Sequence, residues 1–322
     1  MDLKHYTRQI EQGLRSLPLS VDAAIPSLYE PIVYTLDGGG KRLRPVLTLM
    51  AAEALGADSA SALNAALGIE VFHNFTLLHD DVMDRSDLRR GRPTVHARWD
   101  QNTAILSGDA MLTLATQLVA QVPDTALRPV LQAFNQGAMD VYEGQALDMD
   151  FERRDTVTIP EYIRMITLKT GALLATALKV GAIIGGADTE RLEALYDFGT
   201  DLGIAFQIHD DYLDMYGNEE RLGKPAGGDV PNNKQTYLLL TAFAHGGKEA
   251  AALRQAMHME RGERKLAIFR RIYDDLGIAD QCRQATVRYC NRAISALHRA
   301  RLDPDQEARL DARANRLTDR DK

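Results

Sequence analysis

The sequence predicts an all-α protein, and two observations support this prediction. Apolar residues recur at intervals of three and four over four long stretches, 60–78, 105–119, 163–184 and 192–213, which is the spacing of one face of a helix. Runs of alternating β-branched residues, which are typical of strands, are absent. We therefore expect long helices and no sheet.

The expected helices can be bounded in chain order by short clusters of Gly, Pro, Asp and Asn, which favour turns. The stretches 60–78 and 192–213 each end at an acidic cluster, whereas the other two end at turns. No Ser-rich or Gln-rich linker divides the 322 residues, so we expect a single domain over 1–322. We also expect a helical C-terminal segment, 281–322, with a solvated end and no assignable role. The predicted turns are 37–40, 91–93, 123–124, 158–160, 185–188 and 223–233.

Composition argues against several classes of protein. The chain has 45 acidic and 38 basic residues, for a net charge of −7, so no broad basic surface is available for nucleic acid. Its two cysteines, Cys282 and Cys290, are too few for a disulfide framework and lack the spacing of a zinc site, which predicts a reducing, cytoplasmic compartment. We expect no membrane span, because 110–122 is too short and 171–187 is interrupted by Lys179.

Two matching aspartate clusters are the strongest functional signal. The sequence HDDVMD at 79–84 returns as HDDYLD at 209–214, and each ends an apolar helical stretch. On a helix, the three carboxylates of such a cluster lie on one side within about one turn, where their like charges oppose folding. Carboxylate oxygens are hard ligands that favour Mg²⁺. The six candidate metal ligands are Asp80, Asp81, Asp84, Asp210, Asp211 and Asp214.

Basic residues beside these elements suit an anionic ligand such as phosphate. A Gly-rich turn, 38–40, leads to Lys41 and Arg44 at the start of an expected helix, and Arg89 and Arg90 follow the first acidic cluster. Backbone N–H groups and cationic side chains can both bind phosphate at such a turn. The other candidates are Lys169 and Lys224, together with His73 and Gln207, which share the helical phase of the two acidic faces.

In this combination the motifs resemble the trans-isoprenyl diphosphate synthase (polyprenyl synthetase) family over residues 30–240. The resemblance implies an isoprenoid synthase fold, in which helices surround a deep central cavity and the two aspartate clusters face each other at its mouth. It also implies a homodimer. The sequence departs from many members at Asn233, where they have Gly before the lysine. The matching motifs are GGGKRLRP at 38–45, DDVMD at 80–84, RRGRPT at 89–94, KT at 169–170 and FQIHDDYLD at 206–214.

The activity that this resemblance implies is the Mg²⁺-dependent condensation of isopentenyl diphosphate with an allylic diphosphate to give an all-trans prenyl diphosphate. Three Mg²⁺ ions per active site would be held by Asp80, Asp84 and Asp210, and the other three aspartates would support or coordinate them. The implied substrate-binding residues are Arg89, Lys169, Lys224 and Lys234 for the allylic diphosphate, and Lys41, Arg44, His73 and Arg90 for isopentenyl diphosphate. The implied catalytic residues are Lys169, Thr170 and Gln207, of which Thr170 and Gln207 would stabilise the developing cation.

Product length is expected to be short by the same resemblance. In this family, bulky residues upstream of the first cluster form a floor that stops chain growth, and Phe72, Phe75 and the adjacent Thr76 occupy this region. Ideal helix geometry places Phe75 almost opposite the acidic face, so the floor is inferred from the resemblance. In the first cluster, two residues lie between the Asp pair and the last Asp. Many bacterial farnesyl synthases of the family have four there, so the resemblance favours the geranylgeranyl product over farnesyl.

Several alternative functions stay open. The chain could be a longer-chain synthase or a non-catalytic partner subunit of a synthase. A class I terpene cyclase is disfavoured, because its second metal motif mixes Asn, Ser or Thr and Glu, unlike 210–214. An HD-type phosphohydrolase would need a His-rich site that prefers transition metals. The second Asp of each pair and the RRG sequence at 89–91 argue against it.

Overall fold

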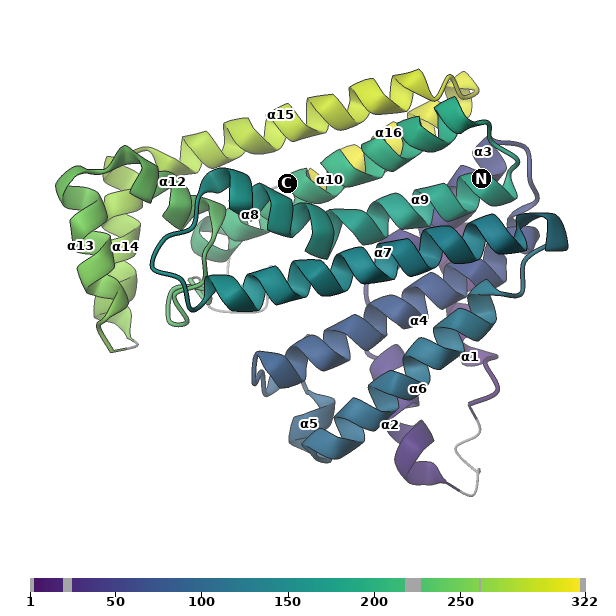
Figure 1. Ribbon diagram of the computed structural model, residues 1–322, viewed down its shortest axis with the longest axis horizontal. Helices are drawn as coiled ribbons and strands as arrows, with labels where there is room; N and C mark the ends of the chain where they lie inside the picture. Colours follow the sequence, from purple (N-terminus) through teal and green to yellow (C-terminus); the bar gives the residue numbers. More distant parts are fainter. Residues whose placement is uncertain (1–2, 20–24, 218–226, 261, 319–322) are drawn as a thin grey trace. The chain divides into compact units, whose positions relative to one another are not determined.

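The computed structural model describes residues 3–19, 25–217, 227–260 and 262–318, and most of these are helical (Figure 1). The prediction of an all-α protein is confirmed. The elements of the first half are α1 (Leu3–Arg15), α2 (Pro26–Leu36), α3 (Leu43–Ala54), α4 (Ser59–Met83), β1 (Leu88–Arg89), β2 (Arg92–Pro93), α5 (Val95–Arg98), α6 (Gln101–Val119) and α7 (Asp124–Phe151). Those of the second half are α8 (Ile159–Ile166), η1 (Thr167–Gly171), α9 (Ala172–Ile184), α10 (Thr189–Tyr216), α12 (Tyr237–His245), α13 (Gly247–Met257), α14 (Glu263–Asp275), α15 (Ile278–Arg299) and α16 (Pro304–Thr318).

A two-stranded hairpin, β1–β2, departs from the prediction of no sheet. Its strands pair antiparallel, with Leu88 opposite Pro93 and Arg89 opposite Arg92. The connecting residues Arg90 and Gly91 both have positive φ, 54° and 72°, which is the requirement of the tight turn that matches strand twist. Strands of two residues are too short to produce an alternating pattern, so periodicity could not reveal them.

The expected helix over 163–184 is interrupted by one π-turn, η1. Both flanking residues keep right-handed helical backbone angles, so the chain continues from α8 into α9 after a local widening. Such π-turns are rare and are frequently found at functional sites. Here the widened turn contains Lys169 and Thr170, two of the predicted catalytic residues.

The chain forms two compact units, each assembled from segments distant in sequence. The single domain expected over 1–322 stays a prediction. Unit 1 consists of Met1–Gln136, Thr176–Leu195 and Ala300–Gln306, and unit 2 consists of Gly137–Ala175, Tyr196–Arg299 and Glu307–Lys322.

Helix α4 is the centre of unit 1, where it packs against α3 and α6, and Figure 1 shows it running beside α6. Its N-terminus is capped by Asp58, which accepts a hydrogen bond from the Ala60 N–H at 3.0 Å. A Cβ at Gly68 would lie 2.6 Å from Val119 and 2.8 Å from the Ala115 carbonyl oxygen. Glycine is therefore required where α4 crosses α6, and the close crossing fixes the helix that carries the first aspartate cluster.

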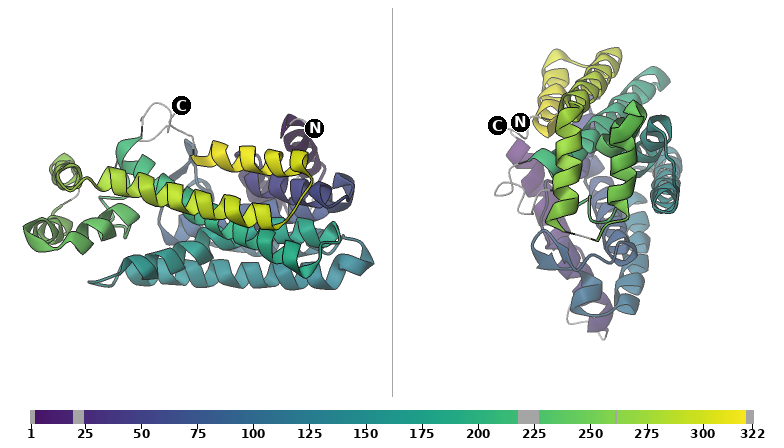
Figure 2. Two further views of the ribbon diagram at one scale, coloured as in Figure 1. Left: turned by 90° about the horizontal axis from the view of Figure 1, so that it is seen from above. Right: turned by 90° about the vertical axis from the view of Figure 1, so that its left-hand side faces the viewer.

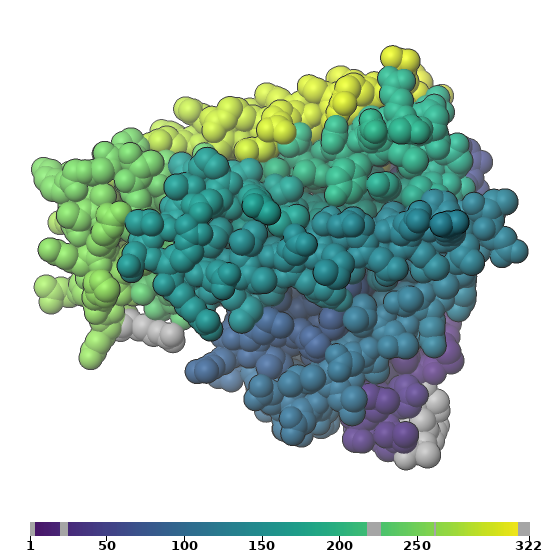
Figure 3. Space-filling view, in the orientation of Figure 1, coloured from purple at the N-terminus to yellow at the C-terminus, as the bar shows by residue number. Residues whose placement is uncertain are grey.

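Unit 2 has its own apolar core, contributed by α8, α10, α12, α14 and α15. Tyr162, Ile208, Leu239, Phe269 and Ile272 are all buried in it. Helices α13 and α14 pack together, as Figure 2 shows, and α15 lies at the surface (Figure 3). The expected helical tail is confirmed in its described part as two helices, α15 and α16.

One continuous helical stretch, Ile159–Ile184, is long and apolar enough to cross a membrane by length and composition alone. However, 72% of its most apolar window is buried inside the structure. Burial against the protein's own residues is what a core helix requires.

Candidate functional site

Both aspartate clusters lie at helix C-termini, the first at the end of α4 and the second at the end of α10. Neither helix has a basic residue in its last turn. A helix C-terminus carries partial negative charge and is stabilised by cations, whereas carboxylates there are unfavourable. Six carboxylates at two negative helix ends therefore create two places that favour cation binding.

Within the first cluster, the three aspartates have different environments. Asp81 is buried, and its Oδ1 accepts a hydrogen bond from Arg89 Nε at 2.7 Å. Burial raises the pKa of Asp81 to about 6, although the charge and hydrogen bond of Arg89 act in the opposite direction. Asp80 is half-buried and Asp84, which caps the helix, is exposed. Asp81 is thus engaged with the hairpin, whereas Asp80 and Asp84 have accessible surface.

The turn of the β1–β2 hairpin reaches the Gly-rich loop before α3. Arg90 donates hydrogen bonds to the backbone carbonyl oxygens of Gly38 and Gly39. A Cβ at Gly40 would lie only 3.0 Å from the Arg90 guanidinium nitrogens, and the φ of Gly40 is +135°. Glycine at this position therefore makes room for the arginine, and the hairpin connects this loop to the end of α4.

Arg44 and His73 form the centre of a cationic cluster in unit 1. Arg44 Nη1 lies 3.1 Å from His73 Nε2, and burial lowers the pKa of Arg44 to about 10. Burial also lowers the pKa of His73 well below its usual range, and the charges of Arg44, Arg90 and Arg89 act in the same direction. His73 is therefore neutral and accepts a hydrogen bond from Arg44. Arg44 Nε is buried without a hydrogen-bond partner among the described residues, so this cluster is suited to bind an anion.

A buried ion pair that sequence reasoning missed holds the segment between the Gly-rich loop and α3 in place. Arg42 donates to Glu70 Oε1 at 2.8 Å, to Glu11 Oε1 at 2.7 Å and to the Leu36 carbonyl oxygen at 2.8 Å. Arg42 has a left-handed backbone, with φ 44°, and its side chain is 1% exposed. Because it lies between the candidate anion ligands Lys41 and Arg44, this anchor fixes their positions. The GGGKRLRP motif contains Arg42, but Glu70 belongs to no motif that we identified.

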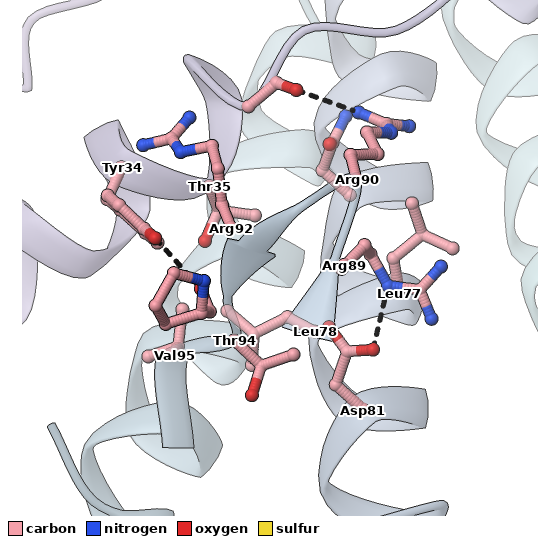
Figure 4. A pocket seen from close by; sticks show the side chains of 13 residues that line it. Tyr34, Thr35, Leu77, Leu78, Asp81, Arg89, Arg90, Arg92, Thr94 and Val95 are labelled. Atoms are coloured by element: carbon pink, nitrogen blue, oxygen red, sulfur yellow. Dashed lines mark hydrogen bonds and ion pairs between the residues drawn. The ribbon is translucent and has the colours of Figure 1, made fainter. Parts of the chain in front are cut away.

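Figure 4 shows a pocket in unit 1 between α2, α4 and the hairpin. Tyr34 donates to the Pro93 carbonyl oxygen at 2.8 Å, and the guanidinium of Arg92 stacks over the Tyr34 ring at 4.1 Å. On the other wall, Arg89 reaches Asp81 (Figure 4). These contacts fasten both hairpin strands to helices and so position Arg89 and Arg90.

The residues predicted to limit chain length form an aromatic cluster in unit 1. Phe72 is fully buried, and its ring centroid lies 5.5 Å from that of Phe75 and 5.3 Å from that of Phe134. Thr76 is half-buried and donates to the His73 carbonyl oxygen at 2.8 Å. These contacts place the rings in a packed core, and their role as a floor stays a prediction.

In the second cluster, two aspartates are tied to the surrounding chain. Asp211 Oδ2 accepts hydrogen bonds from the Tyr162 hydroxyl at 2.6 Å and the Tyr237 backbone N–H at 2.8 Å. Asp214 is buried, and its Oδ2 accepts from the Asp229 backbone N–H at 3.0 Å. Asp210 is half-buried. Burial raises the pKa of Asp211 to about 7 and the charge of Asp229 adds to this, although the hydrogen bonds oppose it.

The π-turn η1 lies where three helices approach closely. A Cβ at Gly144 on α7 would lie 2.3 Å from the Lys169 backbone nitrogen, and one at Gly203 on α10 would lie 2.4 Å from the Gly171 Cα. Glycine at these positions lets α7 and α10 contact the backbone of the turn. Lys169 and the adjacent Thr170 are therefore held by backbone packing.

The side chains of this turn have partners within unit 2. Lys169 Nζ donates to Asp148 Oδ2 on α7 at 2.5 Å, and the Thr170 hydroxyl donates to Gln207 Oε1 at 3.0 Å. Sequence reasoning missed Asp148. It lies one turn after Gln145 on α7, and both of these polar side chains are buried. Asp148 therefore belongs with the candidate site residues.

The loop before α12 carries Lys234, which is half-buried. The preceding Asn233 has a left-handed backbone, with φ 53°, a conformation that Gly and Asn tolerate best. Its side chain accepts from the Lys265 ammonium at 2.6 Å and donates to the Met257 carbonyl oxygen at 3.0 Å. The Asn in place of Gly is thus compatible with the turn. Lys224, another predicted substrate ligand, lies outside the described residues.

The carboxylates fit Mg²⁺ by the chemistry of their donors. Within the described ranges, no three Asp, Glu, His or Cys side chains gather closely enough to hold a metal ion by themselves. Mg²⁺ prefers oxygen ligands and usually binds through one or two carboxylates, with waters and substrate phosphates completing its shell. The accessible aspartates at each helix end meet this requirement.

Comparison with known proteins identifies the family. A family model described as polyprenyl synthetase matches residues 25–276. The chain belongs to the polyprenyl synthetase family. This family member is 44% identical over 247 residues to a geranylgeranyl diphosphate synthase of Methanosarcina mazei, across 74% of this chain and 76% of the relative. It is 42% identical over 276 residues to a farnesyl diphosphate synthase of Geobacillus stearothermophilus, across 80% of this chain and 91% of the relative.

The fold agrees with this assignment. A crystal structure of a geranylgeranyl pyrophosphate synthase matches with a TM-score of 0.94 and 41% sequence identity, and the match covers both chains completely. The isoprenoid synthase fold and the family expected from the motifs are therefore confirmed.

The predicted residues of this polyprenyl synthetase fall into two sets. That the two aspartate clusters face each other stays a prediction. Unit 1 contains Lys41, Arg44, Phe72, His73, Phe75, Thr76, Asp80, Asp81, Asp84, Arg89 and Arg90, and unit 2 contains Lys169, Thr170, Gln207, Asp210, Asp211, Asp214 and Lys234.

Proposed function

We propose that this chain catalyses the Mg²⁺-dependent condensation of isopentenyl diphosphate with an allylic diphosphate, giving a short all-trans prenyl diphosphate and free diphosphate. One observation carries the proposal: the chain has aspartate triplets at the negative ends of α4 and α10 together with a buried arginine whose Nε has no partner among the described groups. Cations at the first two places and an anion at the third are what a metal-dependent diphosphate enzyme must bind.

Isopentenyl diphosphate is bound by the cationic cluster of unit 1. Arg44 and Arg90 supply fixed guanidinium donors, and forked donors of this kind suit phosphate oxygens. Neutral His73 accepts from Arg44, which leaves the arginine's positive charge for the ligand. Lys41, which is exposed two residues before α3, adds a further positive charge.

The allylic diphosphate is bound by Arg89, Lys169, Lys224 and Lys234, together with the metal ions. Asp80, Asp84 and Asp210 would hold three Mg²⁺ ions, because they have accessible surface, whereas Asp81, Asp211 and Asp214 are buried and engaged with neighbouring groups. Bound Mg²⁺ supplies charge stabilisation to the departing diphosphate.

In the reaction, the bond between the allylic carbon and the diphosphate oxygen breaks, and the bonding electrons leave with the diphosphate. The double bond of isopentenyl diphosphate then attacks the allylic cation, and a proton leaves to the departing diphosphate. Thr170 and Gln207 direct their oxygen dipoles toward the developing positive charge. Such preorganised dipoles stabilise a transition state because they need not reorient during the reaction.

We infer a product of twenty carbons, with fifteen as the next candidate. The Phe72 ring packs against the rings of Phe75 and Phe134, with centroids 5.5 Å and 5.3 Å away, and bulky packed rings at this place support a floor. The two similar relatives named above are a geranylgeranyl and a farnesyl synthase at nearly equal identity, so similarity favours a short product without choosing between them. We also propose that the enzyme acts as a homodimer in the cytoplasm, as the family resemblance implies.

The purified protein should be incubated with isopentenyl diphosphate, each of the three short allylic diphosphates, and Mg²⁺, with product length read by mass spectrometry. Products that end at fifteen or twenty carbons would support the proposal. Longer products would refute the floor and favour a long-chain synthase. No condensation would refute the catalytic role and favour a partner subunit.

A further inference from the structure

Three hydrogen bonds in unit 2 connect a buried tyrosine to the predicted catalytic threonine, and a fourth joins them from a backbone N–H. The Tyr162 hydroxyl and the Tyr237 N–H both donate to Asp211 Oδ2, at 2.6 Å and 2.8 Å. Gln207 Nε2 donates to Asp211 Oδ1 at 3.1 Å, and the Thr170 hydroxyl donates to Gln207 Oε1 at 3.0 Å. Tyr162, Thr170 and Asp211 are all less than a tenth exposed.

The direction of each hydrogen bond is set by the chemistry of these groups. In its ionised form the Asp211 carboxylate only accepts, and a Gln amide has one donating and one accepting end. Because the NH₂ group of Gln207 faces Asp211, its oxygen faces Thr170. A hydroxyl has one proton, and Thr170 donates that proton to Gln207. The Thr170 oxygen can therefore only accept from, or present lone pairs to, any further partner.

We propose that Tyr162 is a positioning residue for the reaction. By donating to Oδ2, it holds the Asp211 carboxylate in the rotation that turns Oδ1 toward Gln207. This rotation fixes the direction of the Gln207 amide, and the amide fixes the Thr170 oxygen as the negative end of a dipole for the allylic cation. The inference rests on the proposed condensation, because only a developing positive charge gives that direction a catalytic value.

The same geometry assigns Asp211 a role different from metal binding. Both of its oxygens already accept hydrogen bonds from the protein, two at Oδ2 and one at Oδ1. A carboxylate used in this way orients its neighbours. Asp210, which is half-buried, is the adjacent residue with surface available to an ion.

The test is a double-mutant cycle measured by steady-state condensation kinetics. Tyr162→Phe should lower kcat roughly tenfold, as loss of one hydrogen bond to a charged group would, with KM for both substrates and the Mg²⁺ concentration for half-maximal rate unchanged. Thr170→Val should lower kcat further. The double variant should have the kcat of Thr170→Val alone, because residues that act through one another are not additive.

A control tyrosine lies on α10, the helix that also carries Gln207 and Asp211. Tyr216 donates to Asp274 Oδ1 at 2.9 Å, outside the chain from Tyr162 to Thr170. Tyr216→Phe removes a tyrosine–aspartate hydrogen bond at a more exposed place and should leave kcat unchanged. A tenfold loss in this control, or additive losses in the cycle, would overturn the role of Tyr162 while leaving the condensation itself established by the wild-type rate.

A second variant keeps the test decisive if Tyr162→Phe fails to fold. Asp211→Asn conserves shape but turns an NH₂ group toward Gln207, which reverses the amide and the Thr170 hydroxyl. We expect a lower kcat with an unchanged Mg²⁺ requirement, and no further loss when Thr170→Val is added. A raised Mg²⁺ requirement would show that Asp211 binds metal and would refute the inference. A wild-type protein without condensation activity would instead refute the proposed function, and the inference with it.

Discussion

Replacing Arg42 with Met should strongly destabilise the protein, because it removes the cationic partner of a buried carboxylate. The side chains of Arg42 and Glu70 are 1% and 3% exposed, and their atoms lie 2.8 Å apart. After the substitution, Glu70 Oε1 would retain Asn74 Nδ2 at 3.2 Å, and the Leu36 carbonyl oxygen would lose its guanidinium donor. Breaking a buried ion pair on one side costs about 3–5 kcal/mol.

A surface ion pair of similar length provides the comparison. Arg299 lies 2.6 Å from Asp197, but the two side chains are 57% and 51% exposed. Exposed pairs contribute about 0–1 kcal/mol, so Arg299→Met should change the free energy of unfolding by less than this amount. The two substitutions remove the same group at nearly the same distance, and burial makes the difference between them.

The free energy of unfolding should be measured by urea denaturation with linear extrapolation, and an unchanged slope would show that the unfolded state is comparable. Because Met and Arg both have a Cβ, the left-handed backbone at position 42 strains both residues alike. We also expect Arg42→Met to raise KM for isopentenyl diphosphate, since the anchor lies between Lys41 and Arg44. A loss below about 1 kcal/mol would refute the argument from burial.

Three further predictions follow from the described contacts. Phe72→Ala should cost about 3–5 kcal/mol of unfolding free energy, as large-to-small core substitutions do, and should lengthen the product measured by mass spectrometry; an unchanged product would show that the ring is only part of the core. Gly144→Ala should place a Cβ against the Lys169 backbone, cost about 1–3 kcal/mol through overpacking and lower kcat, whereas full activity would contradict tight backbone packing at η1. Hydrogen bonds from the Thr158 hydroxyl and backbone N–H, followed by one from Arg154, lower the pKa of Glu161 to about 2. This lowered pKa stabilises the fold above the ordinary value near 4.5, and the benefit disappears as pH falls toward 2; the stability difference between wild type and Glu161→Gln, followed by circular dichroism, should therefore vanish over that interval.

Helices and the two aspartate clusters could be predicted from the sequence because both are local patterns. The apolar spacing of 60–78 lies within α4, and the cluster spacing alone placed three carboxylates on one side of a turn. The hairpin turn at Arg90 and Gly91 and the widened turn at Lys169 could not be predicted in this way. The hairpin turn consists of two residues and the widened turn of five, and both are too short to produce a periodic pattern.

Distant partners of the motif residues were also missed. Arg42 pairs with Glu70, 28 positions away, and Lys169 pairs with Asp148, 21 positions away. Sequence motifs showed one member of each pair, because the motif residue follows a local pattern. The partner is a single acidic residue with no pattern of its own, and only the packed structure identifies it.

The acidic helix ends show how stability and activity oppose each other in this enzyme. A chain optimised only for stability would carry Lys or Arg in the last turns of α4 and α10, where a positive charge complements the helix dipole. This protein has three aspartates at each place and no basic residue in either last turn. Asp84→Lys, at the C-cap of α4, should therefore raise thermal stability while removing a proposed metal ligand, a trade-off found where function depends on an unfavourable local arrangement. If Asp84 binds metal as proposed, screens for thermostable variants should select against metal binding at the end of α4.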